Sequence, residues 1–255
     1  MDKKKCTAVV LAAGSGKRMG GNVAKQYLFL GDRPVLWYAL QAFEQNAIID
    51  DVILVVGQGE IPFCTQEIVE RYHFEKITVV IEGGAERYLS VKRALDAIEE
   101  RAGSALDPGV PDSRHSGYVF IHDGARPFVT GDMIRDTYEA AVKYGACVAA
   151  MPVKDTIKLA EGVEFAAQPS NRKQVWAVQT PQVFETPLIC EAYRRLAERL
   201  PALHRDGIEI TDDAMVVETM LGRRVKLVRG DYRNMKLTTP EDMAMAEALL
   251  QSMHG

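Results

Sequence analysis

Short apolar runs alternate along the chain with longer segments in which apolar residues recur every three or four positions. Nearly continuous runs such as VILVV and ITVVI are typical of strands covered on both faces. The predicted strands are Thr7–Ala12, Asp51–Val56, Ile77–Ile81, Tyr118–His122, Val148–Pro152 and Val225–Arg229, and the predicted helices are Pro34–Gln45, Thr65–Tyr72, Glu86–Glu100, Thr130–Tyr144 and one that starts at Pro240. This alternation predicts an α/β fold with a mostly parallel sheet and helices on both sides.

Two segments interrupt the alternation. Arg101–Gly117 is rich in Gly, Pro and Ser, which predicts an exposed loop inserted before a strand. Lys154–Pro181 has strand-like pieces but little helical periodicity, and we expect an extended arm or hairpin lying off the main sheet. We therefore expect one domain over residues 1–255 that includes a protruding β-arm at about 154–181.

Composition limits the classes of partner. The chain has 255 residues, 47% of them hydrophobic and 26% charged, with a formal net charge of -4, which argues against broad nucleic-acid or membrane-surface binding. The four cysteines form no C-x-x-C pair, so they indicate neither a zinc site nor a disulfide framework. The basic start is followed by only a brief apolar run, so we expect no signal peptide and no membrane span. These features predict a cytoplasmic protein.

The stretch LAAGSGKRMG follows the first predicted strand and carries a glycine loop. It is not a dinucleotide fingerprint, because Met19 stands where the third glycine is needed, and no register supplies a P-loop. Cations at Arg18 and Lys25 beside such a loop favour a triphosphate ligand, whereas the alternative is a tight turn with solvated basic residues. The loop residues expected to contact a nucleotide are Ala12, Ala13, Gly14, Ser15 and Gly16.

A second group of polar residues, in VFIHDGARPF, ends the strand predicted at Tyr118–His122. A carboxylate at this place, Asp123, is well placed to reach a Mg²⁺ ion that bridges phosphates, and Gly124 lets a ligand approach the backbone. Arg126 either neutralises phosphates or supports the loop. The alternative is that Asp123 caps a turn and pairs with Arg126, and His122 is expected to pack or orient its neighbours.

The stretch EGGAERYLSV lies at another predicted junction of strand and helix. Its polar groups could form hydrogen bonds to a nucleotide base or ribose. An ordinary helix start explains them equally well. The candidates are Gly84, Arg87 and Ser90.

Further candidates lie in the predicted arm and before the last helix. Thr156, Arg172 and Thr180 belong to the arm, where they are either ligand-binding groups or surface residues of a hairpin. Asn234 and Lys236 lie between the last strand and the last helix, where a solvated loop lysine is the simpler interpretation for the stretch alone.

Taken in order, the motifs resemble a known family over nearly the whole chain. They are LAAGSGKRMG, AKQYLFLGDRPVL, EGGAERYLSV, HDGARPF, PVKDTIK, WAVQTPQVF, TDDA and NMKLTTPEDMAMAE. The set is similar to the 2-C-methyl-D-erythritol 4-phosphate cytidylyltransferases of the non-mevalonate isoprenoid pathway. The resemblance implies a Rossmann-like nucleotidyltransferase domain in a homodimer. It also implies that the acceptor's phosphate attacks the α-phosphorus of CTP in line, giving 4-diphosphocytidyl-2-C-methyl-D-erythritol and pyrophosphate.

The resemblance also implies roles for the candidate residues. Arg18 and Lys25 match the pair that holds the triphosphate, Asp123 matches the Mg²⁺ ligand, and Lys236 matches a lysine of the active site. The residues matching the cytidine-recognising stretch are Gly84, Arg87 and Ser90, and those expected at the acceptor are Arg126, Thr156, Arg172 and Thr180, with Thr156 and Arg172 reaching the partner subunit's site.

Some positions depart from the family pattern. Ala85 and Tyr88 replace an acidic and a smaller residue, Gly124 replaces an alanine, and Arg233 stands where some members carry an aspartate, so no second metal ligand is assigned there. Two rivals remain. A ribitol-5-phosphate cytidylyltransferase favours A-G-G-x-G-x-R-M at the glycine loop, where this chain has Ala12-Ala13-Gly14. A non-catalytic nucleotide-binding protein is expected to have lost Asp123, Lys25 or Arg18, and this chain keeps all three.

Overall fold

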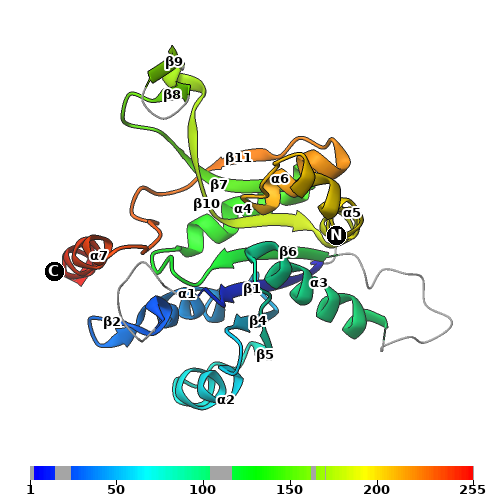
Figure 1. Cartoon of the computed structure of the whole chain (residues 1–255). Coiled ribbons are helices and arrows are strands. Elements are labelled where there is room, and N and C mark those ends of the chain that lie inside the picture. Colours follow the sequence, from blue (N-terminus) through cyan, green and yellow to red (C-terminus); the bar gives the residue numbers. More distant parts are fainter. Residues whose placement is uncertain (1–2, 15–23, 104–116, 162–164, 170, 255) are drawn as a thin grey trace.

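The computed structural model describes residues 3–14, 24–103, 117–161, 165–169 and 171–254. Its centre is a seven-stranded sheet with the order β11-β7-β10-β6-β1-β4-β5 (Figure 1). The strands are β1 (Lys5–Ala12), β4 (Asp51–Val56), β5 (Ile77–Glu82), β6 (Gly117–Asp123), β7 (Ala146–Pro152), β10 (Trp176–Glu185) and β11 (Lys226–Arg229). The six strands predicted from the apolar runs all occur in this sheet, which confirms the α/β fold.

The strand directions bring several loops to one edge of the sheet. β1 pairs in parallel with β4 and β6, β4 with β5, and β11 with β7, whereas β10 runs antiparallel between β6 and β7. Leu11 lies opposite Asp123, and Val56 lies opposite Glu82. The chain therefore leaves β1, β4, β5 and β6 at the same edge, where a parallel sheet usually holds its ligand.

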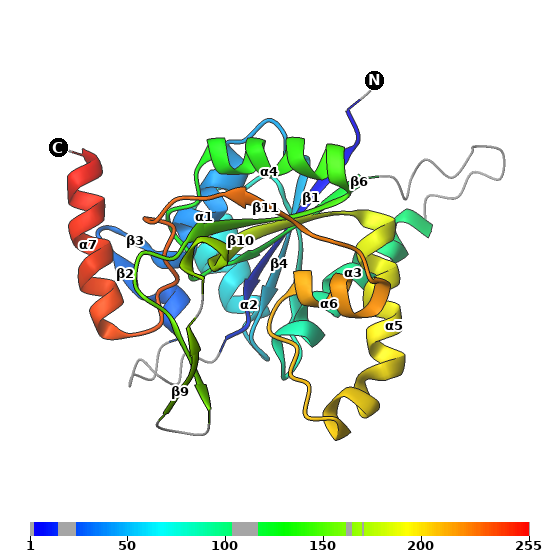
Figure 2. The same cartoon turned by 90° about the horizontal axis from the view of Figure 1, so that it is seen from above.

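Helices cover both faces of the sheet, as the alternation predicts (Figure 2). On β1 the side chains of Ala8 and Val10 enter one buried cluster and that of Val9 enters the other, because successive residues of a strand face opposite sides. One face packs against α1 (Val35–Glu44), α2 (Ile61–Cys64) and α4 (Gly131–Tyr144), and the other against α3 (Arg87–Gly103), α5 (Thr186–Arg205) and α6 (Asp213–Leu221).

The last helix, α7 (Pro240–His254), starts where the sequence predicts. The Asp242 carboxylate accepts hydrogen bonds from the backbone N–H groups of Thr238 and Thr239 at 2.7 and 2.8 Å, so it satisfies donors that a helix start leaves unpaired. Leu237 and Ala246 pack with Leu30 of the small antiparallel pair β2 (Phe29–Leu30) and β3 (Arg33–Pro34).

Three expectations about the elements are corrected. The helix predicted at Thr65–Tyr72 is a π-helical segment, Thr65–Glu70, and it continues directly from α2, which starts four residues earlier at Ile61. The arm predicted at 154–181 is too long, because Trp176–Glu185 forms β10 inside the main sheet. Its remaining part contains the hairpin β8 (Lys158–Glu161) and β9 (Phe165–Pro169), which projects from the body in Figure 1. The loop expected at Arg101–Gly117 is shorter than predicted, because Arg101–Gly103 belong to α3 and Gly117 begins β6, and the rest of it lies outside the described residues.

Candidate active site

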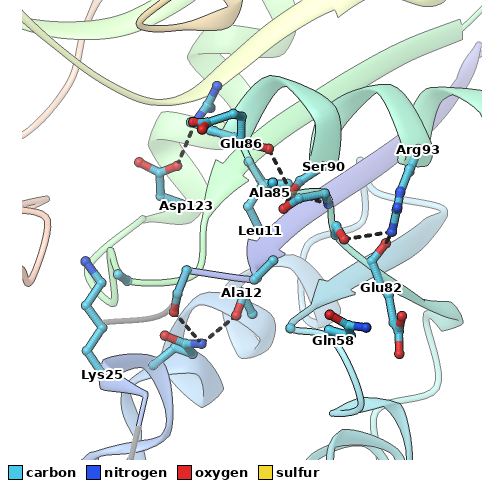
Figure 3. Close-up of a pocket in the computed structure, with 18 of the residues that line it drawn as sticks. Leu11, Ala12, Lys25, Gln58, Glu82, Ala85, Glu86, Ser90, Arg93 and Asp123 are labelled. Carbon is cyan, nitrogen blue, oxygen red and sulfur yellow. Dashed lines mark hydrogen bonds and ion pairs between the residues drawn. The ribbon is translucent and has the colours of Figure 1, made fainter. Parts of the chain in front are cut away.

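A cavity of about 630 Å³ opens at the edge where β1, β4, β5 and β6 end (Figure 3). Backbone hydrogen bonds continue the sheet into its loops: Gly83 N–H donates to Val56 O at 2.7 Å, and Gly124 N–H donates to Leu11 O at 2.8 Å. The lining includes Ala12, Ala13, Gly14, Lys25, Gly84, Arg87, Ser90, Asp123 and Lys236. The structure therefore brings together candidates from five separate stretches of sequence.

The described part of the glycine loop is held by a residue that sequence analysis missed. Gln26 is 2% exposed, and its side-chain amide donates to Ala12 O at 2.5 Å and to Gly14 O at 3.2 Å. Its neighbour Lys25 reaches the cavity wall, as Figure 3 shows. Ser15, Gly16 and Arg18 lie outside the described residues.

The opposite wall comes from the start of α3. Ser90 is buried, and its hydroxyl accepts a hydrogen bond from Gly84 N–H at 3.0 Å. A Cβ at Gly84 would lie 2.3 Å from Leu89 Cβ, so this glycine is needed for the packing of the loop itself. Arg93 donates to Glu82 O and Gly83 O at 3.0 and 2.7 Å and fixes the same turn. Ser90 thus shapes the wall from within.

Three cationic side chains of the site surround the Asp123 carboxylate. Lys236 Nζ lies 2.9 Å from Asp123 Oδ2, Arg87 Nε lies 3.4 Å from Oδ1, and Arg126 Nε lies 3.6 Å from Oδ2. Burial alone raises the pKa of Asp123, but Arg87, Lys236 and Arg126 together outweigh burial and lower it far below its usual value. Asp123 is therefore an anion at neutral pH, with cations on several sides.

The backbone around Asp123 is fixed by a buried polar network. Thr180 Oγ1 accepts from Asp123 N–H at 3.1 Å and lies 2.9 Å from His122 Nδ1, while His122 Nε2 lies 3.1 Å from Arg126 O. Because a carbonyl only accepts, Nε2 carries a proton. Burial lowers the pKa of His122 to about 4, so at neutral pH the ring is neutral and its Nδ1 accepts from the Thr180 hydroxyl. His122 and Thr180 thus orient the loop, as expected for His122.

Gly124 lies where there is no room for a side chain. A Cβ there would lie 2.8 Å from Leu36 Cδ1 and 3.0 Å from Leu11 O. The absence of a side chain therefore lets the end of β6 approach β1 and α1 closely.

A second cavity, of about 510 Å³, adjoins the first. Both are lined by Arg87, Asp123 and Lys236. The second is also lined by Arg126, Gln179, Thr180, Gln182, Asp212, Ala214, Met215 and Glu218. The site therefore consists of two chambers that meet at Asp123, a division that sequence analysis did not predict.

The buried partner of Arg87 was also missed. Arg87 Nη2 lies 2.7 Å from Asp213 Oδ2, although the two residues are 126 positions apart. Burial lowers the pKa of the Arg87 guanidinium, but the carboxylates of Asp213 and Asp123 more than compensate and raise it above its ordinary value. The TDDA motif marked the position, but nothing local in the sequence indicated the pairing.

Two candidates do not join the site within this chain. Thr156 and Arg172 are exposed near the base of the arm, and neither lines either cavity. Arg172 Nη1 donates to Lys154 O at 2.9 Å, which connects the two sides of the arm.

Among the described residues, no group of three or more His, Cys, Asp or Glu side chains is arranged to hold a metal ion. The one carboxylate at the junction, Asp123, suits a metal that takes most of its ligands from substrate phosphates and water, as Mg²⁺ does. In the described part of the chain, no helix is both long and apolar enough to cross a membrane.

A family model and curated relatives that match the chain carry the same description. The family model described as 2-C-methyl-D-erythritol 4-phosphate cytidylyltransferase matches residues 6–252. Proteins with that name from Lachnoclostridium phytofermentans and Geobacter metallireducens are 43% and 44% identical to the chain, with 97% and 96% of the chain and 97% of each relative covered.

Solved structures that match the fold of the chain belong to proteins with the same described activity. The crystal structure of 4-diphosphocytidyl-2C-methyl-D-erythritol synthase from Anaerococcus prevotii matches with a TM-score of 0.76 at 31% identity, covering 98% of this chain and 97% of that one. The 2-C-methyl-D-erythritol 4-phosphate cytidylyltransferase from Thermus thermophilus matches with a TM-score of 0.67 at 32% identity, covering 95% and 98%.

Proposed function

The chain belongs to the 2-C-methyl-D-erythritol 4-phosphate cytidylyltransferase family and is a nucleotidyltransferase of the non-mevalonate isoprenoid pathway, and from this premise we propose how its residues carry out the reaction. The observation that carries the proposal is the junction of two cavities at Asp123, Arg87 and Lys236. We assign CTP to the larger cavity and methylerythritol phosphate to the smaller one, so that the reacting groups meet at the junction.

The nucleotide is bound by the loops after β1 and β5. Backbone N–H groups of the glycine loop suit the phosphates, while Gly84 and Ser90 shape the wall that faces the base. Lys25, together with Arg18, neutralises the triphosphate and the charge that develops on the α-phosphorus as pyrophosphate leaves.

The acceptor is bound in the smaller cavity beside Arg126 and Thr180. Arg126 Nε is buried and has no hydrogen-bond partner among the described residues, and it lies 3.6 Å from Asp123 Oδ2. A buried guanidinium N–H without a partner favours an anionic ligand such as the acceptor's phosphate. Lys236, which lines both cavities, brings positive charge between the two phosphate groups as one oxygen attacks the α-phosphorus in line.

Asp123 is the residue that would hold Mg²⁺. When bound with the triphosphate, the ion supplies Lewis-acid neutralisation of phosphate charge. Asp123 itself is kept anionic by its cationic neighbours, so its carboxylate is available over the physiological pH range.

Two copies of the chain are proposed to form the working enzyme, with each arm completing the acceptor site of the other. The arm exposes the large apolar side chains of Leu159 and Phe165, and it carries Thr156 and Arg172 away from the cavities of its own chain. These positions support a role in the partner's site.

The test of the proposal is release of pyrophosphate with CTP and Mg²⁺, measured in parallel with methylerythritol phosphate and ribitol 5-phosphate. We expect release with methylerythritol phosphate that EDTA abolishes. Release with ribitol 5-phosphate alone would preserve the chemistry but change the acceptor, and the absence of release with either would contradict the assignment.

A further inference from the structure

Asp213 is a wholly buried carboxylate at the start of α6, and the mechanism above does not use it. Both of its oxygens are engaged: Oδ1 accepts from the Tyr193 hydroxyl at 2.5 Å, and Oδ2 lies 2.7 Å from Arg87 Nη2. A buried carboxylate is stable only when its charge and lone pairs are satisfied in this way. Asp213 is therefore tightly bound to Arg87, and it lines neither of the two cavities.

Arg87 itself lies between two carboxylates. Its Nη2 is 2.7 Å from Asp213, whereas its Nε is 3.4 Å from Asp123 Oδ1. Arg87 lines both cavities. The orientation of its guanidinium, held toward Asp213 or turned toward Asp123, therefore sets where its positive charge lies relative to the junction. The geometry favours the contact with Asp213.

The helix that carries Asp213 is itself anchored to the sheet. Gln182 of β10 accepts from Ala214 N–H at 3.0 Å and donates to Asp212 Oδ2 at 3.0 Å, so it fixes the first turn of α6. Asp212, Ala214 and Met215 line the smaller cavity. Asp213 is thus placed by the same turn that forms the wall of the acceptor chamber.

We propose that Asp213 is a positioning residue that holds the Arg87 guanidinium between the two chambers and prevents it from closing onto Asp123. This inference rests on the proposed function. Without the Asp213 charge, the buried guanidinium would move to Asp123, the other carboxylate that it contacts, because charged acceptors bind it more strongly than neutral ones. The Arg87 guanidinium would then cover Asp123, and its positive charge would leave the space where the two phosphates meet.

The experiment is a double-mutant cycle with Asp213→Asn and Arg87→Gln, each made alone and together, with kcat and both KM values measured. Asparagine keeps the shape of Asp213 but removes its charge, and glutamine still offers a donor to the buried carboxylate. We expect Asp213→Asn to lower kcat by about tenfold to a hundredfold. In the Arg87→Gln background the same change should cost no more than about twofold, because the residue through which Asp213 acts is gone.

Tyr193→Phe is the matched control. It removes the hydrogen bond to Asp213 Oδ1 but leaves the contact with Arg87, so we expect a lower melting temperature with kcat within about threefold of wild type. Equal losses of kcat from Asp213→Asn in both backgrounds, or an equal loss from Tyr193→Phe, would overturn the inference. An inactive wild type would instead contradict the proposed function, so the two failures are distinguishable.

Discussion

Lys25 places its charge on the wall of the larger cavity. In a reaction between two anions, a cation at the α-phosphorus acts mainly on the transition state. Lys25→Ala is therefore expected to lower kcat by about a hundredfold or more, and Arg18→Ala likewise. Steady-state pyrophosphate release measures both, and turnover near that of wild type in both variants would refute the assignment.

His122 makes the stability of the folded chain depend on pH. Its pKa falls from 6.5 to about 4 because burial disfavours the imidazolium. Between these two pH values the unfolded chain binds a proton that the folded chain does not, so the free energy of unfolding decreases as the pH falls, by up to about 3 kcal/mol. The contribution of Asp123, whose pKa is lowered from 3.8, is lost only at more acidic pH.

Urea unfolding at pH 7 and at pH 4.5 measures this dependence. In His122→Gln the loss between the two pH values should be smaller than in the wild type, because glutamine does not titrate. The same loss in both proteins would show that other groups cause the pH dependence.

At the scale of a single residue, the sequence predicted the residue types that the chemistry requires. It also offered one pairing that the structure contains, Asp123 with Arg126 at 3.6 Å, but not the shorter contacts. Asp123 and Lys236 were both candidates, and the structure places them 2.9 Å apart. Arg87 was expected to read the base or ribose, yet its short contact is with Asp213, 126 positions away. No local pattern encodes such a contact, because it depends on how α3 and α6 are placed on the same face of the sheet.

At the scale of elements, a short 3-10 turn, Lys25–Tyr27, fixes the glycine loop. Gln26 donates to two loop carbonyls, and Tyr27 OH donates to Glu60, whose carboxylate also accepts from Gly57 N–H. The turn therefore connects the loops that follow β1 and β4, and it sets where Lys25 lies on the wall of the larger cavity.

Gln26→Glu tests this arrangement. A carboxylate of the same shape cannot donate to the two carbonyls, so we expect kcat/KM for CTP to fall by about tenfold or more, with little change in KM for the acceptor. Gln58→Glu adds the same charge to an exposed position on the same cavity wall and is the matched control. If both substitutions lowered kcat/KM for CTP equally, the added charge alone would explain the loss.

The elements themselves were predicted with unequal success. Apolar runs identified the strands predicted at Asp51–Val56 and Ile77–Ile81. The first is buried on both faces, whereas the second lies at the edge of the sheet and its apolar side chains are only partly buried against the two clusters. Trp176–Pro181, the first part of β10, was assigned to the arm because that stretch is rich in polar residues. Gln179 and Thr180 are nevertheless buried, as is Gln182 in the rest of the strand. Their burial is compensated by hydrogen bonds to Asp231, His122 and Asp212, which only the folded chain supplies.

At the scale of the whole molecule, the question is whether an active site is built from one chain or from two. Arg172 is exposed at the arm and does not line either cavity of its own chain, whereas Lys25 lines the larger cavity. If arms are exchanged in a symmetric dimer, each complete site takes Lys25 from one subunit and Arg172 from the other. Arg172→Ala alone should then weaken use of the acceptor more than binding of CTP.

Complementation distinguishes the two arrangements. Lys25→Ala and Arg172→Ala chains are each expected to be nearly inactive, but after unfolding and refolding together in equal amounts half of the dimers are mixed. A mixed dimer with exchanged arms contains one wild-type site, so the mixture should recover about a quarter of wild-type activity. If each site were built within one chain, every site would carry one of the two substitutions. The mixture would then be no more active than the average of its parts, and the arm would have no role in the partner's site.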